Sequence, residues 1–216
     1  MTAIDCQSYL LRVNEVVIEG GSFNAISGRT RPAISLSNVT NAMIREWSCS
    51  NYSHGFGGGC LNLSSSMLQI LDSVFTDNRA ATGGVVSVGG TTSSLTVERC
   101  SFRNNSGHDG GVFYTEAFAL LAIANSNFSD NSATSRGGVV CHESGSGRFT
   151  VNGSDFTNNI AKCGGAVYFS MGGPFTFVED SFISNSATLE GGAVYLSHCG
   201  SPVSYTHLTL PTIYSV

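Results

Sequence analysis

A phrase built around one phenylalanine recurs five times along the chain, at intervals of 27, 26, 28 and 26 residues. An asparagine stands three residues after each phenylalanine, and a Gly-Gly pair follows eight to ten residues after it. The phenylalanines are Phe75, Phe102, Phe128, Phe156 and Phe182, and the asparagines are Asn78, Asn105, Asn131, Asn159 and Asn185. Sequence periods of 20 to 50 residues indicate stacked repeat architectures, so this repeat decides the fold class.

The same register continues toward the N-terminus in a degraded form. Counting 26 residues back from Phe75 reaches Cys49, which is followed by Gly58-Gly59-Cys60. A further 26 residues back stands Phe23, with Ala33-Ile34 where the residues after Gly-Gly belong. The chain therefore contains seven repeat units, of which two have diverged.

Apolar residues alternate with polar ones before each phenylalanine, as at Leu68/Ile70, and again after each Gly-Gly pair, as at Val86/Val88. Alternation with period two predicts half-buried strands. Each unit thus has two clear strands, a third short one around the phenylalanine, and turns rich in Gly, Asn and Ser. Because such a unit cannot bury its inner face alone, the units must stack. We predict an all-β fold, a parallel β-helix of about seven coils.

The repeated residues acquire roles from stacking alone. The phenylalanines are expected to form an internal aromatic column. The asparagines are expected in turns, where Asn tolerates a left-handed backbone, and they can form a hydrogen-bonded ladder between coils. The Gly-Gly pairs supply positive φ and room for close backbone approach. Cys49 and Cys60 are interpreted as packing residues, since no two cysteines occupy equal positions in neighbouring units.

Composition excludes several classes of protein. Hydrophobic residues make up 41% of the 216, which is enough to bury a core, whereas charged residues make up only 12%. The net charge of −5 leaves no basic surface for nucleic acid. The longest apolar run, 117–124, is too short to span a bilayer. The first residues do not have the pattern of a signal peptide, so no targeting signal is expected in this segment.

The phrases FTNN, FISN and FSDN, with GGAV at 164–167 and 191–194, resemble the FxxN and GGA[ILV] repeats of the chlamydial polymorphic outer membrane proteins. The resemblance covers roughly residues 16–199, and three units depart from it with GGVV or GGVF. It implies a right-handed, single-stranded parallel β-helix of the pectin-lyase-like class. It also implies an adhesive, secreted or surface-displayed protein.

Ionisable side chains do not form a catalytic constellation in the repeat. Asp77 and Asp130 occupy one column but are two coils apart, about 10 Å. Glu46, Asp72 and Arg99 share another column, which we interpret as a surface ion network. His108 has none of the partners of a catalytic histidine on this fold. The histidines do not align and CxxC is absent, so we expect no catalytic residue, no metal and no cofactor.

One outward column is aromatic. Tyr114, Tyr168 and Tyr195 occupy equal positions after the Gly-Gly pairs. Such a stripe suits a glycan or a protein partner, and cross-coil aromatic packing explains it equally well. Six glycosylation sequons also occur, at Asn38, Asn51, Asn62, Asn104, Asn127 and Asn152.

The repeat ends abruptly near residue 200. We expect a leading segment of incomplete coil at 1–15, repeats at 16–200 and a non-repeat tail at 201–216. The tail contains VSYTHLTLPT, which resembles a translated sequencing adaptor; a diverged capping strand is the alternative.

The function expected from all this is that of a non-catalytic extracellular or cell-surface segment, adhesive or structural, with glycans or host and cell-surface proteins as partners. The alternative is a carbohydrate-binding or carbohydrate-active β-helix whose active coils lie outside this segment.

Overall fold

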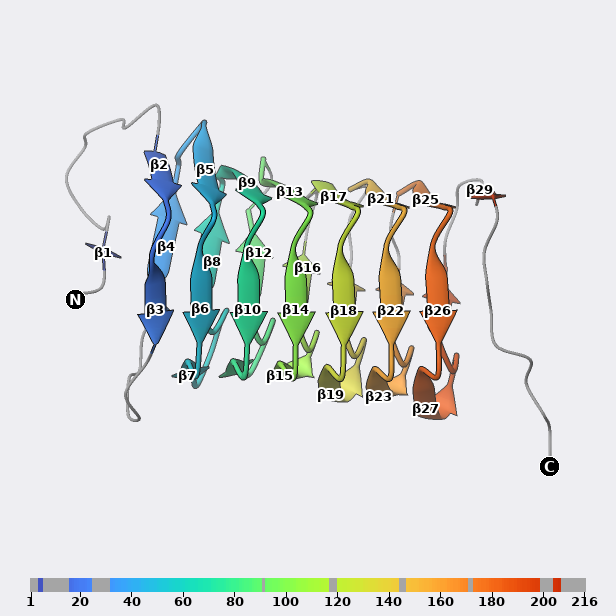
Figure 1. The fold of residues 1–216 in the computed structure, drawn as a ribbon. Coiled ribbons are helices and arrows are strands. Elements are labelled where there is room, and N and C mark those ends of the chain that lie inside the picture. Colours follow the sequence, from blue (N-terminus) through green and yellow to red (C-terminus); the bar gives the residue numbers. More distant parts are fainter. Residues whose placement is uncertain are drawn as a thin grey trace.

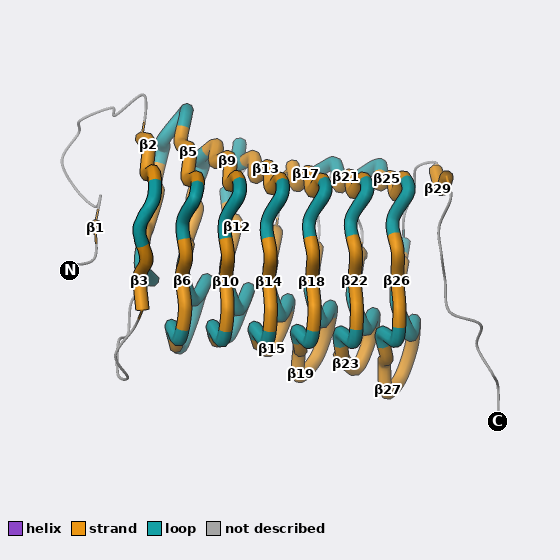
Figure 2. The backbone as a smooth tube through the Cα atoms, viewed as in Figure 1, coloured by secondary structure: helices purple, strands orange, loops and turns teal. Residues whose placement is uncertain are grey.

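Every strand of the computed structural model pairs in parallel with the equivalent strand one repeat away, which produces a solenoid (Figure 1). The structure describes residues 4–5, 16–24, 32–90, 92–116, 120–143, 147–170, 173–198 and 204–206. Within these ranges the chain forms strands, turns and bends but no helix (Figure 2). The expected leading segment 1–15 and tail 201–216 lie outside the described residues, except for the short strands at 4–5 and 204–206.

The strands form four parallel sheets that run along the solenoid. Sheet A contains β1 (Ile4–Asp5), β4 (Ile34–Ser37), β8 (Leu61–Ser64), β12 (Val86–Gly89), β16 (Phe113–Glu116), β20 (Val140–Glu143), β24 (Val167–Ser170) and β28 (Val194–Ser197). Sheet B contains β2 (Val16–Glu19), β5 (Ala42–Arg45), β9 (Met67–Leu71), β13 (Ser94–Glu98), β17 (Leu120–Ala124), β21 (Phe149–Asn152), β25 (Phe175–Val178) and β29 (Ser204–Thr206).

The other two sheets are made of shorter strands. Sheet C contains β3 (Ser22–Asn24), β6 (Ser48–Ser50), β10 (Val74–Thr76), β14 (Ser101–Arg103), β18 (Asn127–Ser129), β22 (Asp155–Thr157) and β26 (Ser181–Ile183). Sheet D contains β7 (Ser53–His54), β11 (Arg79–Ala80), β15 (Ser106–Asp109), β19 (Ser132–Arg136), β23 (Ile160–Cys163) and β27 (Ser186–Glu190).

Each turn of the chain passes through sheets B, C, D and A in that order, and the repeat phenylalanines lie in register in sheet C, as Phe75 does with Phe102. Sheet C holds one strand for each of the seven repeat units, so six turns separate Phe23 from Phe182. The predicted all-β parallel solenoid is thereby confirmed. Sheet D is a fourth strand per unit, where we expected three. Strands such as β15, with the sequence SGHD, lack an alternating apolar pattern and form by backbone pairing with their neighbours.

The asparagines three residues after each phenylalanine do not occupy the left-handed turns in which we expected them. Positive φ angles are found instead two residues after the phenylalanine, as at Asp77 (57°), and three residues before it, as at Asp72 (48°). Asn78 and its equivalents Asn105, Asn131 and Asn159 are fully buried. The corners of each coil are thus made by polar residues in the left-handed region, mostly Asp, Asn and Ser but also Glu46, Arg99 and Glu179.

The buried asparagines form a continuous hydrogen-bonded ladder. The side-chain oxygen of Asn131 accepts bonds from both the backbone N–H of Asn105 (3.0 Å) and its Nδ2 (3.1 Å). The second Nδ2 hydrogen of Asn131 goes to the carbonyl of Phe102, at 3.0 Å. The pattern repeats from Asn78 to Asn185, and in the preceding coil the N–H of Tyr52 donates to Asn78 Oδ1 at 3.1 Å. Each amide therefore ties a coil to both neighbours.

The phenylalanines stack directly beside this ladder. Adjacent rings from Phe75 to Phe182 are 4.6–5.0 Å apart and nearly parallel, which is the offset arrangement that aromatic rings favour. Cys49 leaves a gap in the column, and Trp47 fills it. The Trp47 ring lies 5.4 Å from Phe23 and 5.6 Å from Phe75, so the column continues into the diverged units.

The interpretation of Cys49 and Cys60 as packing residues is wrong, because the structure joins them in a disulfide. Both are fully buried, 11 residues apart in sequence, with Cα atoms 6.5 Å from each other. We had expected a bridge only between equal positions of neighbouring coils. This one crosses the interior of a single coil, from sheet C to the residue before β8. Cys100, Cys141 and Cys163 are free, whereas Cys6 and Cys199 lie outside the described residues.

The Gly-Gly pairs are required for two different reasons. The first glycine of each pair has a φ of 62–68°. The second approaches the next coil so closely that a Cβ on Gly138 would lie 2.1 Å from the carbonyl oxygen of Gly165. Side chains are excluded there because two backbones, neither of which can move aside, already fill the space.

His142 and Thr115 form a further buried polar pair, on neighbouring strands of sheet A. His142 is 2% exposed, its ring stacks on Phe169 at 4.4 Å, and its Nδ1 bonds to the Thr115 hydroxyl at 2.7 Å. Its Nε2 has no partner. Burial lowers the pKa of His142 from 6.5 to about 4, so the imidazole stays neutral in the folded protein.

We predict that Gly138→Ala lowers the free energy of unfolding by about 3–5 kcal/mol, because the new methyl group meets backbone rather than side chain. Gly55→Ala is the matched control, since nothing lies within 4 Å of a Cβ at Gly55. Its effect should stay within about 0.5 kcal/mol. Urea unfolding measures both. Equal stability of the two variants would contradict the close approach of the coils.

Acid should weaken the fold through His142. Between pH 6.5 and about 4 the unfolded chain binds a proton at residue 142 that the folded chain does not bind. The free energy of unfolding is therefore unaffected by this group above pH 6.5 and decreases as the pH falls below 6.5. The loss at pH 5 is about 2 kcal/mol. His142→Phe should remove this part of the pH dependence, and the exposed His108→Asn should leave it unchanged. Unfolding midpoints measured at pH 7 and pH 5 check the difference.

Candidate functional site

A cluster of charged and aromatic side chains begins at the residue before the Gly-Gly pairs. This position forms a column in which Asp109 pairs with Arg136, Arg136 with Cys163, and Cys163 with Glu190. The sequence analysis did not align this column. The signal that could have revealed it was an acid and a base, Asp109 and Arg136, at the same position of neighbouring repeats.

Arg136, at the end of β19, is the centre of the cluster. Its Nε donates to Asp109 Oδ1 at 2.8 Å, and its Nη1 pairs with Glu143. The hydrogen bond to Asp109 raises the pKa of Arg136 above its ordinary value. Glu143 also accepts a bond from the Tyr114 hydroxyl at 3.1 Å. The Asp109 side chain is only 9% exposed, so this ion pair lies largely out of contact with water.

The predicted tyrosine column lies on the outer side of sheet A beside this cluster. Tyr114 and Tyr168 are separated by Cys141, whereas Tyr168 and Tyr195 are direct neighbours whose rings stack at 5.2 Å. The guanidinium of Arg136, from the preceding coil, lies 5.3 Å from the centre of the Tyr168 ring. Tyr168 is therefore covered by Tyr195 on one face and by Arg136 on the other.

This arrangement limits the chemistry of the column. Stacking on a sugar needs an open ring face, and Tyr168 has none. Burial raises the pKa of Tyr114 to about 12, so its hydroxyl remains a hydrogen-bond donor to Glu143. Burial likewise raises the pKa of Cys141 to about 12, which keeps the thiol protonated and unreactive. The geometry is that of a packing and ion-pair network that joins sheets D and A.

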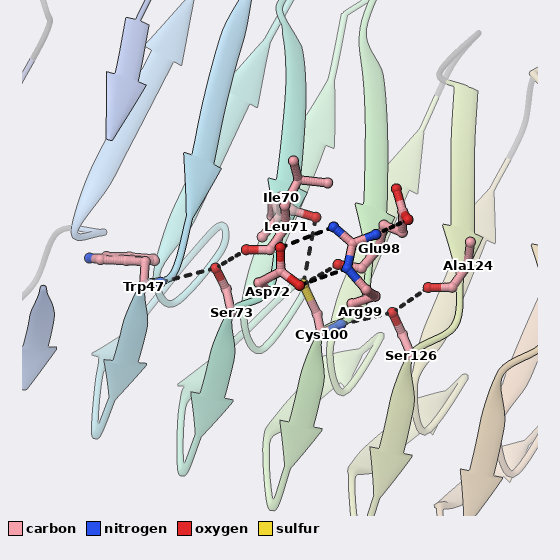
Figure 3. Close-up of polar contacts among 10 residues, drawn as sticks. All are labelled: Trp47, Ile70, Leu71, Asp72, Ser73, Glu98, Arg99, Cys100, Ala124 and Ser126. Atoms are coloured by element: carbon pink, nitrogen blue, oxygen red, sulfur yellow. Dashed lines mark hydrogen bonds and ion pairs between the residues drawn. The ribbon is translucent and has the colours of Figure 1, made fainter. Parts of the chain in front are cut away.

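Asp72 and Arg99 of the expected network lie at the corner between sheets B and C (Figure 3). Glu46 occupies the equivalent corner one coil earlier and makes no ion pair with them. Arg99 makes a two-point bond to Asp72, with Nε–Oδ1 of 2.7 Å and Nη2–Oδ2 of 3.0 Å, and also pairs with Glu98. The hydrogen bond from Arg99 lowers the pKa of Asp72. Arg99, Asp72 and Glu98 are well exposed, so water and salt screen these contacts.

A buried ladder lies beneath these ion pairs (Figure 3). The hydroxyl of Ser126 donates to the carbonyl of Ala124 at 2.8 Å and accepts the backbone N–H of Cys100 at 3.1 Å. Ser73 makes the same contacts with Leu71 and Trp47. At the equivalent position in its coil, Asp180 accepts the N–H of Ser154, and its burial raises its pKa to about 6. This column also stacks coils rather than holding a ligand.

The remaining candidates are dispersed. Asp77 and Asp130 bond to the asparagines of the following coils, Asn104 and Asn158, rather than to each other. His108 bonds to Thr134 at 2.8 Å. Over the ranges that the structure describes, no three His, Cys, Asp or Glu side chains gather closely enough to hold a metal ion.

The sequon asparagines are mostly surface residues. Asn62 is half-buried on sheet A, and the other five are exposed. Asn38, Asn51 and Asn104 have positive φ. Their presence at the corners of coils is explained by backbone conformation alone.

Removing the charge of Arg136 should destabilise the protein. In Arg136→Gln the buried Asp109 carboxylate loses its partner, and we expect the free energy of unfolding to fall by about 2–4 kcal/mol. Arg99→Gln is the control, because its partners are exposed to water, and should remain close to the wild type. Thermal or urea unfolding compares them. If both variants had the same free energy of unfolding as the wild type, the network around Arg136 would not contribute to stability.

Comparisons with known families agree with this geometry. Residues 4–156 match the family described as right handed beta helix region. Residues 153–170 match the Chlamydia polymorphic membrane protein repeat. Comparison with curated proteins and with solved structures yields no match. The stacked coils and the family match over more than half of the chain lead to one conclusion: this chain belongs to the right-handed β-helix family and carries a repeat of the polymorphic membrane protein type.

Proposed function

We propose that this chain is a non-catalytic β-helix segment displayed at a cell surface or secreted, where it acts as an adhesive or structural spacer. One observation carries the proposal: the repeated residues make their contacts from coil to coil. The Phe column, the Asn ladder and the Gly-Gly contacts all run along the solenoid axis. A repeat shaped in this way favours length and rigidity over a single reactive centre.

Two further features support an extracellular location. The polymorphic membrane protein repeat is a repeat of surface-type proteins. The buried Cys49–Cys60 disulfide is typical of an oxidising compartment. Across the described ranges there is no helix with the length and apolar character to cross a bilayer.

A non-catalytic role is supported by the ion pairing of the outer columns. The buried carboxylate of Asp109 is tied to Arg136, and so is Glu143. The bidentate contact with Arg99 also lowers the pKa of Asp72, which makes that carboxyl a poor general acid.

Surface display can be tested on cells of the source organism. An antibody raised against the folded chain should label intact cells or precipitate the protein from the medium, and external trypsin should remove the cell-bound signal. Peptide mapping without reduction should recover Cys49 linked to Cys60. Labelling that appears only after permeabilisation, together with reduced Cys49 and Cys60, would contradict the proposal.

The adhesive role has its own test. Beads coated with the folded chain should attach to cells more than beads coated with the heat-unfolded chain or with an unrelated β-helix of similar length. If the three kinds of beads attached equally, the adhesive role would be contradicted, whereas the role as a structural spacer would be unaffected.

A further inference from the structure

A groove of about 660 Å³ crosses the outer side of sheet D. Its floor is made by β7, β11, β15 and β19, and much of its lining is small, such as Gly55, Ala81 and Gly107. Four parallel strands cover three strand spacings, about 14 Å. A groove of this length has room for a linear oligomer rather than for one small molecule.

An arginine without a carboxylate partner stands in the middle of this groove. Arg79 is exposed and lies in register between Ser53 and Ser106 of the neighbouring coils. Among the other described arginines, Arg45, Arg99, Arg103 and Arg136 each pair with a carboxylate. Arg79 and the exposed Arg148 pair with none in the described ranges, and of these two only Arg79 lines the groove. Its guanidinium therefore offers donors to a ligand, with serine hydroxyls on both sides.

Two histidines flank the arginine, and the groove lining contains no acid. His54 bonds through Nδ1 to the Gly57 carbonyl at 2.5 Å, and His108 bonds through Nδ1 to Thr134 at 2.8 Å. Each imidazole is thus held in place through Nδ1, and the Nε2 atom of His108 lies 3.9 Å from Asp109 Oδ2, just outside the lining. On a chain of net charge −5 this lining selects for anionic ligands.

An exposed aromatic ring adjoins the groove. Phe56 follows the lining residue Gly55 and is 81% exposed, the highest value among the large apolar side chains that the structure describes. Its ring lies 6.3 Å from that of His54, and its carbonyl accepts the N–H of Thr82 at 2.9 Å, which fixes the loop to the next coil. Phe56 therefore presents the open apolar ring face that Tyr168 lacks.

We propose that this groove binds an acidic oligosaccharide, with a sugar ring on Phe56 and a carboxylate or sulfate group on Arg79. The combination of an open aromatic face, one unpaired guanidinium, hydroxyl groups along the floor and a length of several strand spacings fits a linear, negatively charged glycan. This inference rests on the proposed adhesive function and deepens it, because it names the ligand class and the surface that binds it.

Calorimetric titration of the folded chain with a hyaluronan hexasaccharide tests the proposal, with a neutral chitin hexasaccharide as the comparison ligand. The wild type should bind the acidic oligosaccharide saturably and the neutral one at least about tenfold more weakly. Arg79→Gln and Phe56→Ala should each weaken binding about tenfold or more. Arg103→Gln removes the same charge from the exposed side of sheet C and should leave the affinity within about twofold.

The proposal is overturned if the wild type does not bind the acidic hexasaccharide, or if Arg79→Gln and Arg103→Gln behave alike. Displacement of the oligosaccharide by inorganic phosphate at equal concentration would show a simple anion site and would also overturn it. Unfolding midpoints of every variant, compared with the wild type, separate loss of the site from loss of the fold. If coated beads attach to cells equally with and without Arg79→Gln, adhesion stands and this groove is not its cause.

Discussion

Each coil of this solenoid depends on its neighbours, because its strands hydrogen-bond only to the equivalent strands one repeat before and after. Backbone hydrogen bonds alone do not determine which residues of neighbouring coils lie opposite each other. The Asn ladder specifies it, since each buried amide has donors and acceptors only when it lies directly above the next. The fully satisfied network makes a slipped register costly, as it would leave several buried polar groups without partners.

The inner columns were readable from the sequence because they repeat. Phenylalanine and Gly-Gly recur at fixed spacing, and their roles follow from stacking. Features that occur only once were not readable in this way. Trp47 fills the place of a phenylalanine from two residues away, and Cys49 bridges to Cys60 across one coil, so neither follows the repeat register. Such substitutions depend on the volume available inside one particular coil, and an alignment of the repeats does not show that volume.

On the outer surface, too, the sequence predicts features that repeat and not those that occur once. The sequence analysis interpreted the charged residues at the left-handed corners as a surface ion network, and polar side chains occur at these corners because of the backbone conformation. The charged cluster around Arg136 was missed because the residues before the Gly-Gly pairs were not aligned. The groove around Arg79 was missed because it draws its residues from several repeat positions. The repeat therefore predicts the scaffold well, whereas recognition depends on departures from the repeat. This separation suits a surface protein, in which a constant rod can carry changing contacts.

The central claim, that the Asn ladder locks each coil to the next, is tested most directly by amide hydrogen exchange. The backbone N–H groups of Asn78, Asn105 and Asn131 each donate to the side chain of the next asparagine. Our account predicts that these amides exchange only when the whole solenoid unfolds, with the same opening free energy as the central strands of sheet C. Exchange of these three amides at rates typical of exposed turns would contradict it.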